Sequence, residues 1–152
     1  LTPGDVVVAA GLADPLPNST SSLPRVRLAD GKNWTGVIGV VESRMALQPV
    51  PGKADEAGNV PLELHSVPGP AKAGDYVALT VLGVAHVKAD AGGGAIVPGQ
   101  RLTAADLPGH ARALRSKLLD GMTVTEGAPV IGIALAPLEE GSGTIPVFVT
   151  LR

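Results

Sequence analysis

Short apolar runs separated by Gly and Pro recur along the whole chain. The clearest runs are GDVVVAA at 4–10, TGVIGVV at 35–41, GDYVALTVLG at 74–83, and the two closing runs at 130–135 and 145–151. Short Val- and Ile-rich runs bounded by turn residues predict β-strands. Weaker strands are expected at 25–28, 45–50, 60–64, 84–88 and 96–102. The pattern therefore predicts an all-β fold, either a short-stranded sandwich or a barrel.

The two closing runs have the most regular pattern. Apolar residues alternate in the second run, and Ile131, Ile133 and Leu135 share one parity in the first. The polar, Gly-rich sequence EEGSGT between the runs is typical of a hairpin loop. We therefore expect the apolar residues of this hairpin to lie in the core or in an interface: Val130, Ile131, Ile133, Leu135, Ile145, Val147, Val149 and Leu151.

One segment has helical rather than strand-like spacing. Ala111, Leu114 and Leu118 would share one face of a helix, and Gly121 could end it. At most one short helix, near 111–119, is therefore expected. The length of 152 residues suits a single all-β domain over 1–152, which can be subdivided into 1–70 and 71–152.

The sequence also repeats itself weakly. GDVVVAA at Gly4 is similar to GDYVALT at Gly74, and PGQRLTA at Pro98 is a third variant. GVIGVVE at Gly36 is likewise similar to PVIGIAL at Pro129. The first three segments place a Gly and a polar residue before an apolar strand, which predicts a recurrent turn-and-strand unit.

Composition restricts the kind of core. Apolar residues make up 45% of the chain, but the aromatic residues are only Trp34, Tyr76 and Phe148. The core must therefore consist of Val, Leu, Ile and Ala. The chain has no Cys, which excludes thiolate metal sites, thiol catalysis and disulfides.

Charge and hydropathy restrict the partners. The formal net charge is −2 with no large basic block, whereas nucleic-acid binding usually needs a basic face. No apolar run approaches the roughly 18 residues of a membrane-spanning helix. We expect neither nucleic-acid binding nor membrane insertion. The opening LTPGDVVVAA, which lacks Met, predicts a processed product or a domain of a longer protein.

No set of residues with catalytic or metal-binding spacing is found. His65, His86 and His110 lie far apart in the sequence, without an HxH or HxxxH pattern. Asp75, Asp90 and Asp106 lie in or beside turns, where Asp usually accepts backbone hydrogen bonds. No Ser lies in GxSxG or SxxK, and no phosphate-binding Gly-rich motif occurs. The sequence therefore predicts no catalytic residue, metal site or cofactor.

Trp34 is the one candidate for ligand contact. It follows Lys32 and Asn33 in a predicted turn, and an exposed Trp beside polar groups can stack on a sugar ring. The alternative is that its ring covers one end of the aliphatic core. A glycan partner therefore depends on whether this ring is exposed.

Residues 83–152 resemble a C-terminal module of long bacterial surface proteins and phage tail-fibre-like proteins. The resemblance lies in GVAHVKAD, in IVPGQRLTAADLPGHARAL and above all in VIGIALAPLEEGSGTIPVFV. This module is similar to the peptidase G2-type intramolecular chaperone domains of phage appendages. The resemblance implies a homotrimer, and in some members self-cleavage. No Ser and Asp of this chain match the self-cleaving pair.

Three functions follow as hypotheses. The first is a non-enzymatic structural domain that drives oligomerisation at the C-terminal tip or cap of a longer extracellular, cell-surface or virion protein, as a trimer or a fibre. The second is a self-processing intramolecular chaperone. The third is a carbohydrate-binding module that uses Trp34.

Overall fold

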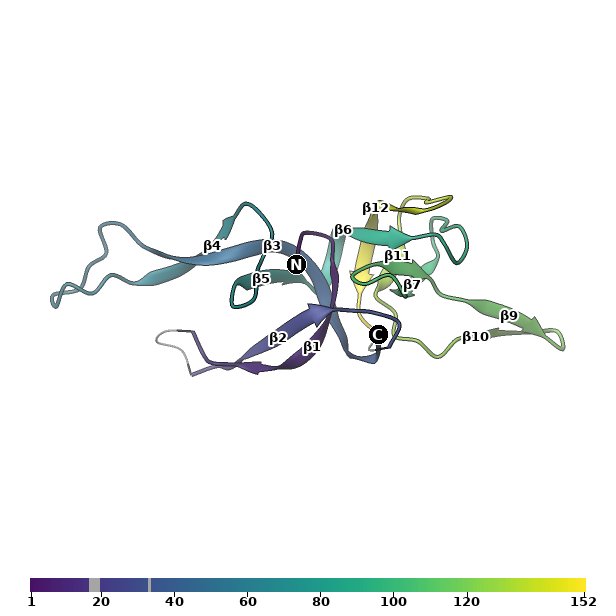
Figure 1. Ribbon diagram of the computed structural model, residues 1–152, viewed down its shortest axis with the longest axis horizontal. Coiled ribbons are helices and arrows are strands. Elements are labelled where there is room, and N and C mark those ends of the chain that lie inside the picture. The colour runs from purple at the N-terminus through teal and green to yellow at the C-terminus, as the bar shows by residue number, and fades with distance from the viewer. Residues whose placement is uncertain (17–19, 33) are drawn as a thin grey trace.

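Strands make up nearly all of the regular structure, as the sequence predicts. The computed structural model describes residues 1–16, 20–32 and 34–152. The strands form a five-stranded sheet, a closed barrel and a separate two-stranded ribbon. The molecule is elongated, with hairpins of the sheet at one end and the ribbon at the other (Figure 1).

The sheet contains the first half of the chain. β3 (Val37–Pro49) is its central strand and pairs with three others in antiparallel fashion. β1 pairs with the start of β3 and also with β2, while β4 pairs with its last part and β5 with its middle. The bounds of these other strands are Val6–Ala13 (β1), Leu23–Leu28 (β2), Leu62–Val67 (β4) and Tyr76–Thr80 (β5). A 3-10 turn, η1 (Trp34–Gly36), precedes β3.

The barrel contains most of the second half of the chain. Its strands close in the order β11-β12-β6-β8-β7. The longest pairing joins β6 to β12 over the whole length of both strands, while β6 and β8 form the single parallel contact among these pairs, Ala89 with Ala111. The bounds are Leu82–Asp90 (β6), Arg101–Ala104 (β7), Ala111–Ala113 (β8), Gly132–Ala134 (β11) and Ser142–Thr150 (β12).

The helix expected near 111–119 is wrong. This segment forms β8 and then β9 (Ser116–Leu119), which pairs with β10 (Met122–Thr125). Asp120 and Gly121 connect them with φ of 48° and 81°, the two positive values that a tight hairpin turn requires. Ala111 is buried in the barrel, so strand pairing prevails over the helical spacing.

The core is aliphatic, as the composition predicts. Its buried cluster, among the described residues, contains Val, Leu, Ile and Ala and spans both sheet and barrel, from Val6 and Val40 to Val87 and Val149. Small side chains such as Ala89, Ala104 and Ala134 fill the barrel interior together with larger ones. A barrel of few strands is narrow inside, and its interior has room for such residues.

The N-terminal turn joins the sheet to the barrel. The amide of Lys88 on β6 donates to the carbonyl of Gly4 at 2.9 Å. The Lys88 ammonium also lies 2.5 Å from Oδ1 of the buried Asp5, at the start of β1. Val6, Ala29 and Gly109 close a ring of backbone bonds in which each amide donates to the next carbonyl at 2.8–2.9 Å.

The three related Gly-containing segments form the same turn, which confirms the predicted recurrent unit. In each, Gly at the third position has φ near 90°, a value that favours glycine. The fourth residue's amide donates to the first carbonyl, and its side-chain oxygen accepts from the first amide. The turns are Thr2–Asp5, Lys72–Asp75 and Val97–Gln100, with side-chain bonds of 2.7, 2.9 and 2.9 Å.

Candidate functional site: the outer face of the barrel

The closing hairpin forms, but only part of it faces the core. β11 pairs with β12, as expected. Four of its predicted core residues are buried, namely Ile131, Ile145, Val147 and Val149, while Val130 and Leu151 are partly buried. Ile133 and Leu135 are exposed and do not share the inward face of Ile131. The single parity predicted for the first strand is therefore wrong.

A shift of register explains this error. Gly132 faces Val149, whereas Val130 exchanges both backbone hydrogen bonds with Arg152. From one pair to the other, the first segment moves two residues, from 132 to 130, whereas the second moves three, from 149 to 152. The inward–outward alternation of side chains is therefore interrupted between Ile131 and Gly132. A one-residue shift exchanges the two faces of a strand. Gly132 and Ala134 consequently point inward, and Ile133 points outward.

The outward positions form an apolar row across three strands. Ile133 on β11 faces Phe148 on β12, and Phe148 faces Val84 on β6. Their exposed fractions are 36%, 40% and 64%, respectively. We call Ile133, Phe148 and Val84 the outer row. Arg101 on β7 faces Ile133 and borders the row on one side.

Apolar residues continue on both sides of the outer row. Leu82 faces Thr150 one outward position along the β6–β12 ladder, and it is exposed. Leu135 is also exposed, and its amide donates to the carbonyl of Pro146 at 2.9 Å. Monomeric proteins rarely leave extended apolar patches open to water, and such patches mark interaction sites. The outer face of the barrel is therefore the candidate functional site.

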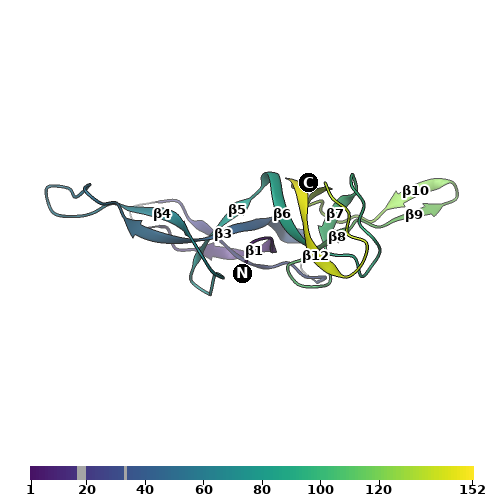
Figure 2. The ribbon, with the colours of Figure 1, turned by 90° about the horizontal axis from the view of Figure 1, so that it is seen from above.

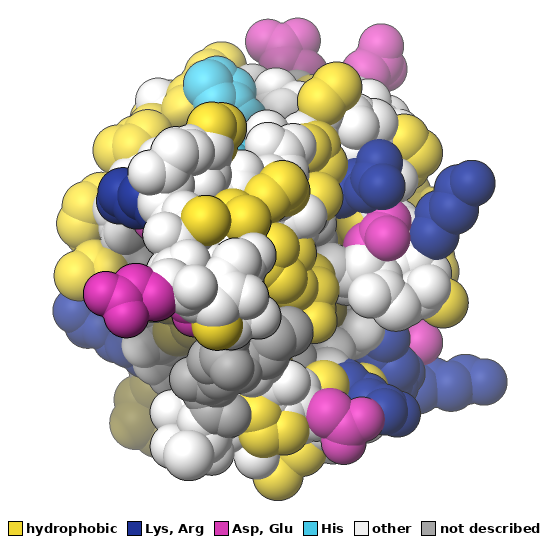
Figure 3. Space-filling view, turned by 90° about the vertical axis from the view of Figure 1, so that its left-hand side faces the viewer, with side chains coloured by type: hydrophobic (Ala, Val, Ile, Leu, Met, Phe, Trp, Pro, Cys, Tyr) yellow, Lys and Arg dark blue, Asp and Glu magenta, His cyan; other side chains and the backbone are white. Residues whose placement is uncertain are grey.

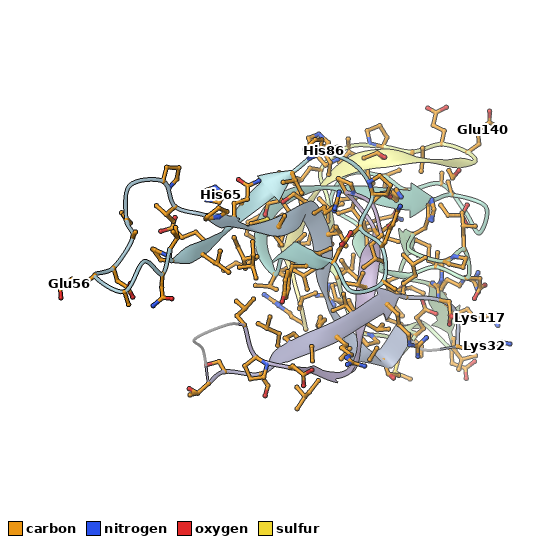
Figure 4. The ribbon with its side chains drawn as sticks, turned by 60° about the vertical axis from the view of Figure 1, so that its left-hand side comes forward. Lys32, Glu56, His65, His86, Lys117 and Glu140 are labelled. Carbon is orange, nitrogen blue, oxygen red and sulfur yellow. The ribbon has the colours of Figure 1, made fainter. Side chains whose placement is uncertain are left out.

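Titratable groups form no comparable site. Among the described residues, no group of three or more His, Asp or Glu could hold a metal ion. His65 on β4 and His86 on β6 lie on different strands, and Glu56, Lys117 and Glu140 lie at the periphery of the molecule (Figure 4). His110 Nδ1 lies 2.9 Å from the carbonyl of Pro108.

Two of the three turn aspartates have the predicted structural role. Asp75 accepts from the amide of Lys72 and forms an ion pair with Arg44 at 2.9 Å. These contacts, with the backbone bond first, hold the pKa of Asp75 below its usual value. Asp90 accepts from the amide of Gly92 at 3.0 Å.

A cleft of about 570 Å³ lies beside Arg44. Its lining includes Thr2, Ser43, Ser66 and Pro68. Arg44, which also lines it, is paired with Asp75, so the cation there is already neutralised. The end of the molecule that carries the sheet hairpins shows apolar, basic and acidic side chains side by side, without a field of one sign (Figure 3).

The glycan hypothesis rests on the side chain of Trp34, which is not among the described side chains. The backbone of Trp34 begins η1. Contact between Trp34 and a glycan stays a prediction.

Sequence reasoning missed Phe148 and Val84. The run that contains Val84 does not show which parity faces water, whereas the alternation of residues 145–151 puts Phe148 on the same side as Thr144 and Thr150. The presence of Phe148 between Val147 and Val149 is the available signal, because it places a large apolar side chain on the face of β12 that otherwise carries Thr144 and Thr150.

Comparisons with family models, with curated proteins and with solved structures found no match to this chain. Within the described residues, no helix has the length and apolar character needed to cross a membrane.

Proposed function

We propose that this chain is a non-enzymatic assembly domain that forms a homo-oligomer through the outer face of its barrel. The outer row carries the proposal, because three large apolar side chains lie side by side in water. Fully burying one such side chain stabilises a protein by roughly 1.5–3 kcal/mol. Covering the row in every copy would supply several such contributions at once.

The position of the row on a barrel favours an interface between rigid surfaces. Closure pairs the strands on both sides, so the row does not depend on a mobile edge. Phe148, moreover, lies between Val147 and Val149, which are fully buried. A partner would therefore meet a preformed surface, which reduces the entropic cost of association.

The number of copies and the location rest on the resemblance of residues 83–152 to phage and bacterial surface modules. We propose a trimer, at the C-terminal tip or cap of a longer protein outside the cell or on a virion. The ion pairs Lys88–Asp5 and Arg44–Asp75 connect parts of the fold, a structural use that supports a non-enzymatic role.

The test replaces the aromatic ring of the outer row. Phe148→Ser removes the largest side chain of the row, and Leu62→Ser is the matched control, because Leu62 is an exposed apolar residue on β4 in the sheet. Light scattering should show a smaller particle for Phe148→Ser only, with both variants folded by circular dichroism. Equal particle masses for both variants and the unmodified chain would count against the outer row as the interface.

A further inference from the structure

The β9–β10 ribbon has one mainly apolar face and one mainly polar face. Cross-strand partners lie on the same side of a ribbon, and the side alternates with each step. Leu119 pairs with Met122 and Lys117 with Val124, so these four share one face. The opposite face carries Leu118, with Ser116, Thr123 and Thr125.

The apolar face of the ribbon is open to water. Leu119, Met122 and Val124 have exposed fractions of 59%, 66% and 49%. Lys117, on the same face, can lay its alkyl chain beside them. An isolated two-stranded hairpin is at best marginally stable in water, and further packing is what usually stabilises it.

The ribbon is fixed at its base and points away from its own barrel. Glu126 accepts two bonds from the Arg112 guanidinium, at 2.5 and 3.0 Å, and one from the amide of Arg115 at 2.8 Å. The amide of Glu126 in turn donates to the carbonyl of Arg115. Two views at right angles show the ribbon extending beyond the barrel along the long axis (Figures 1 and 2). Its tip therefore cannot cover the outer row of the same chain.

We propose that the apolar face of the ribbon packs on the outer row of a second copy of this chain. The inference rests on the proposed function and gives the interface its second half. Each copy presents both the apolar face of the ribbon and the outer row to water, and the ribbon points away from the row of its own chain. A second copy is the occupant that supplies both surfaces in equal number.

The two surfaces also agree in size and character. Three neighbouring strands place the ends of the outer row about 10 Å apart, and the Leu119–Met122 and Lys117–Val124 pairs lie about 7 Å apart along the ribbon. Both surfaces are apolar at the centre. Arg101 borders the row and Lys117 lies on the ribbon, so docking must leave these two like charges apart and in water at the rim. Neither surface would bury an unpaired carboxylate of the other.

This arrangement is heterologous, because the apolar face of the ribbon on one copy contacts the outer row of the next copy, so two different surfaces meet. Heterologous contacts close into a ring when the rotation between copies permits, and otherwise extend as a fibre. The same contact thus accommodates the trimer proposed above as well as a filament.

The test uses the absence of native Cys in the sequence. Met122→Cys places a thiol on the ribbon and Val84→Cys places one on the outer row, both at exposed positions that should tolerate the change. The double variant, assembled and then treated with a short bismaleimide linker, should form covalent multimers. The matched control combines Met122→Cys with Leu62→Cys, which puts the second thiol on β4. The control and each single variant should remain one chain long.

Light scattering before the linker is added separates the two proposals. If the double variant is oligomeric but yields no multimers beyond those of the control, the ribbon does not contact the outer row and this inference is wrong, while assembly stands. If the protein is a monomer, both proposals are wrong. A linkage within one chain, detected by mass spectrometry, would overturn the inference, because it would place the ribbon on its own barrel.

Discussion

Gly132 approaches the backbone of Phe148 more closely than any other residue type could. A Cβ atom at Gly132 would lie 2.3 Å from the carbonyl oxygen of Phe148 and 2.8 Å from the Val147 side chain. Real Cβ atoms essentially never come so close to backbone. Glycine at position 132 therefore allows β11 to lie this close to β12. Gly132 points inward here, next to Ile133, which points outward.

Gly132→Ala should therefore destabilise the fold. Either β11 moves away from β12 or the Phe148 carbonyl shifts, and overpacking of this kind costs about 1–3 kcal/mol. Gly127→Ala is the control, because a Cβ there would meet nothing within 4 Å. Urea denaturation should show a lower midpoint for the first variant and an unchanged or higher midpoint for the second. Equal midpoints would show that the hairpin yields easily at Gly132.

Val147→Asp should prevent folding or assembly. Val147 is fully buried, and the substitution places an unpaired carboxylate in an apolar layer. Thr150→Asp lies on the opposite, outward face of β12 and is only partly buried, so it is a control for folding: it should retain a cooperative thermal transition, although a charge beside the outer row should weaken assembly. A normal melting curve for Val147→Asp would contradict the inward direction of this side chain.

Asp5→Ala should weaken the connection between sheet and barrel. The substitution leaves the Lys88 ammonium without its carboxylate and the amide of Thr2 without its acceptor. Hydrogen bonds to charged groups contribute about 1.5–3 kcal/mol each, so a loss of roughly this size is expected in the free energy of unfolding. Asp14→Ala, at an exposed position, should change it by no more than about 0.5 kcal/mol. Equal effects would mean that the ion pair adds nothing to the fold.

Acid should loosen the base of the ribbon. The hydrogen bond from Arg112, with the amide bond from Arg115 and the nearby cations, holds the pKa of Glu126 below its usual value of 4.5. A carboxyl whose pKa is lower in the folded state stabilises that state above the unfolded-state pKa, and this contribution disappears as pH falls through the folded-state value. The stability difference between the native chain and Glu126→Gln should thus shrink between about pH 6 and about pH 3. A constant difference would show that the Glu126 charge is not involved.

Much of the fold could be predicted from the sequence, because Gly and Pro separate the strands so regularly. The strands at Val6, Val37 and Tyr76 and the closing pair lie within or close to the predicted runs, and the aliphatic core follows from the scarcity of aromatics. The turn unit at Gly4, Gly74 and Gly99 was also visible as a repeated string.

Two features depend on interactions that the local pattern does not contain. Ala111, Leu114 and Leu118 have helical spacing, but Asp120–Gly121 makes a tight turn and Ala111 pairs in the barrel. The parity of Ile133 depends on a shift of register opposite Arg152, a long-range event. The outer row depends on the same shift, because the shift turns Ile133 outward and so brings it beside Phe148, whose outward parity the alternation of β12 does indicate.

The mass of the native particle tests the central claim most directly. Light scattering of the unmodified chain at low micromolar concentration measures whether copies of the chain associate. The account predicts a stable oligomer, with a mass three times that of one chain for the proposed trimer. A homogeneous particle with the mass of a single chain would contradict the claim that this domain forms a homo-oligomer.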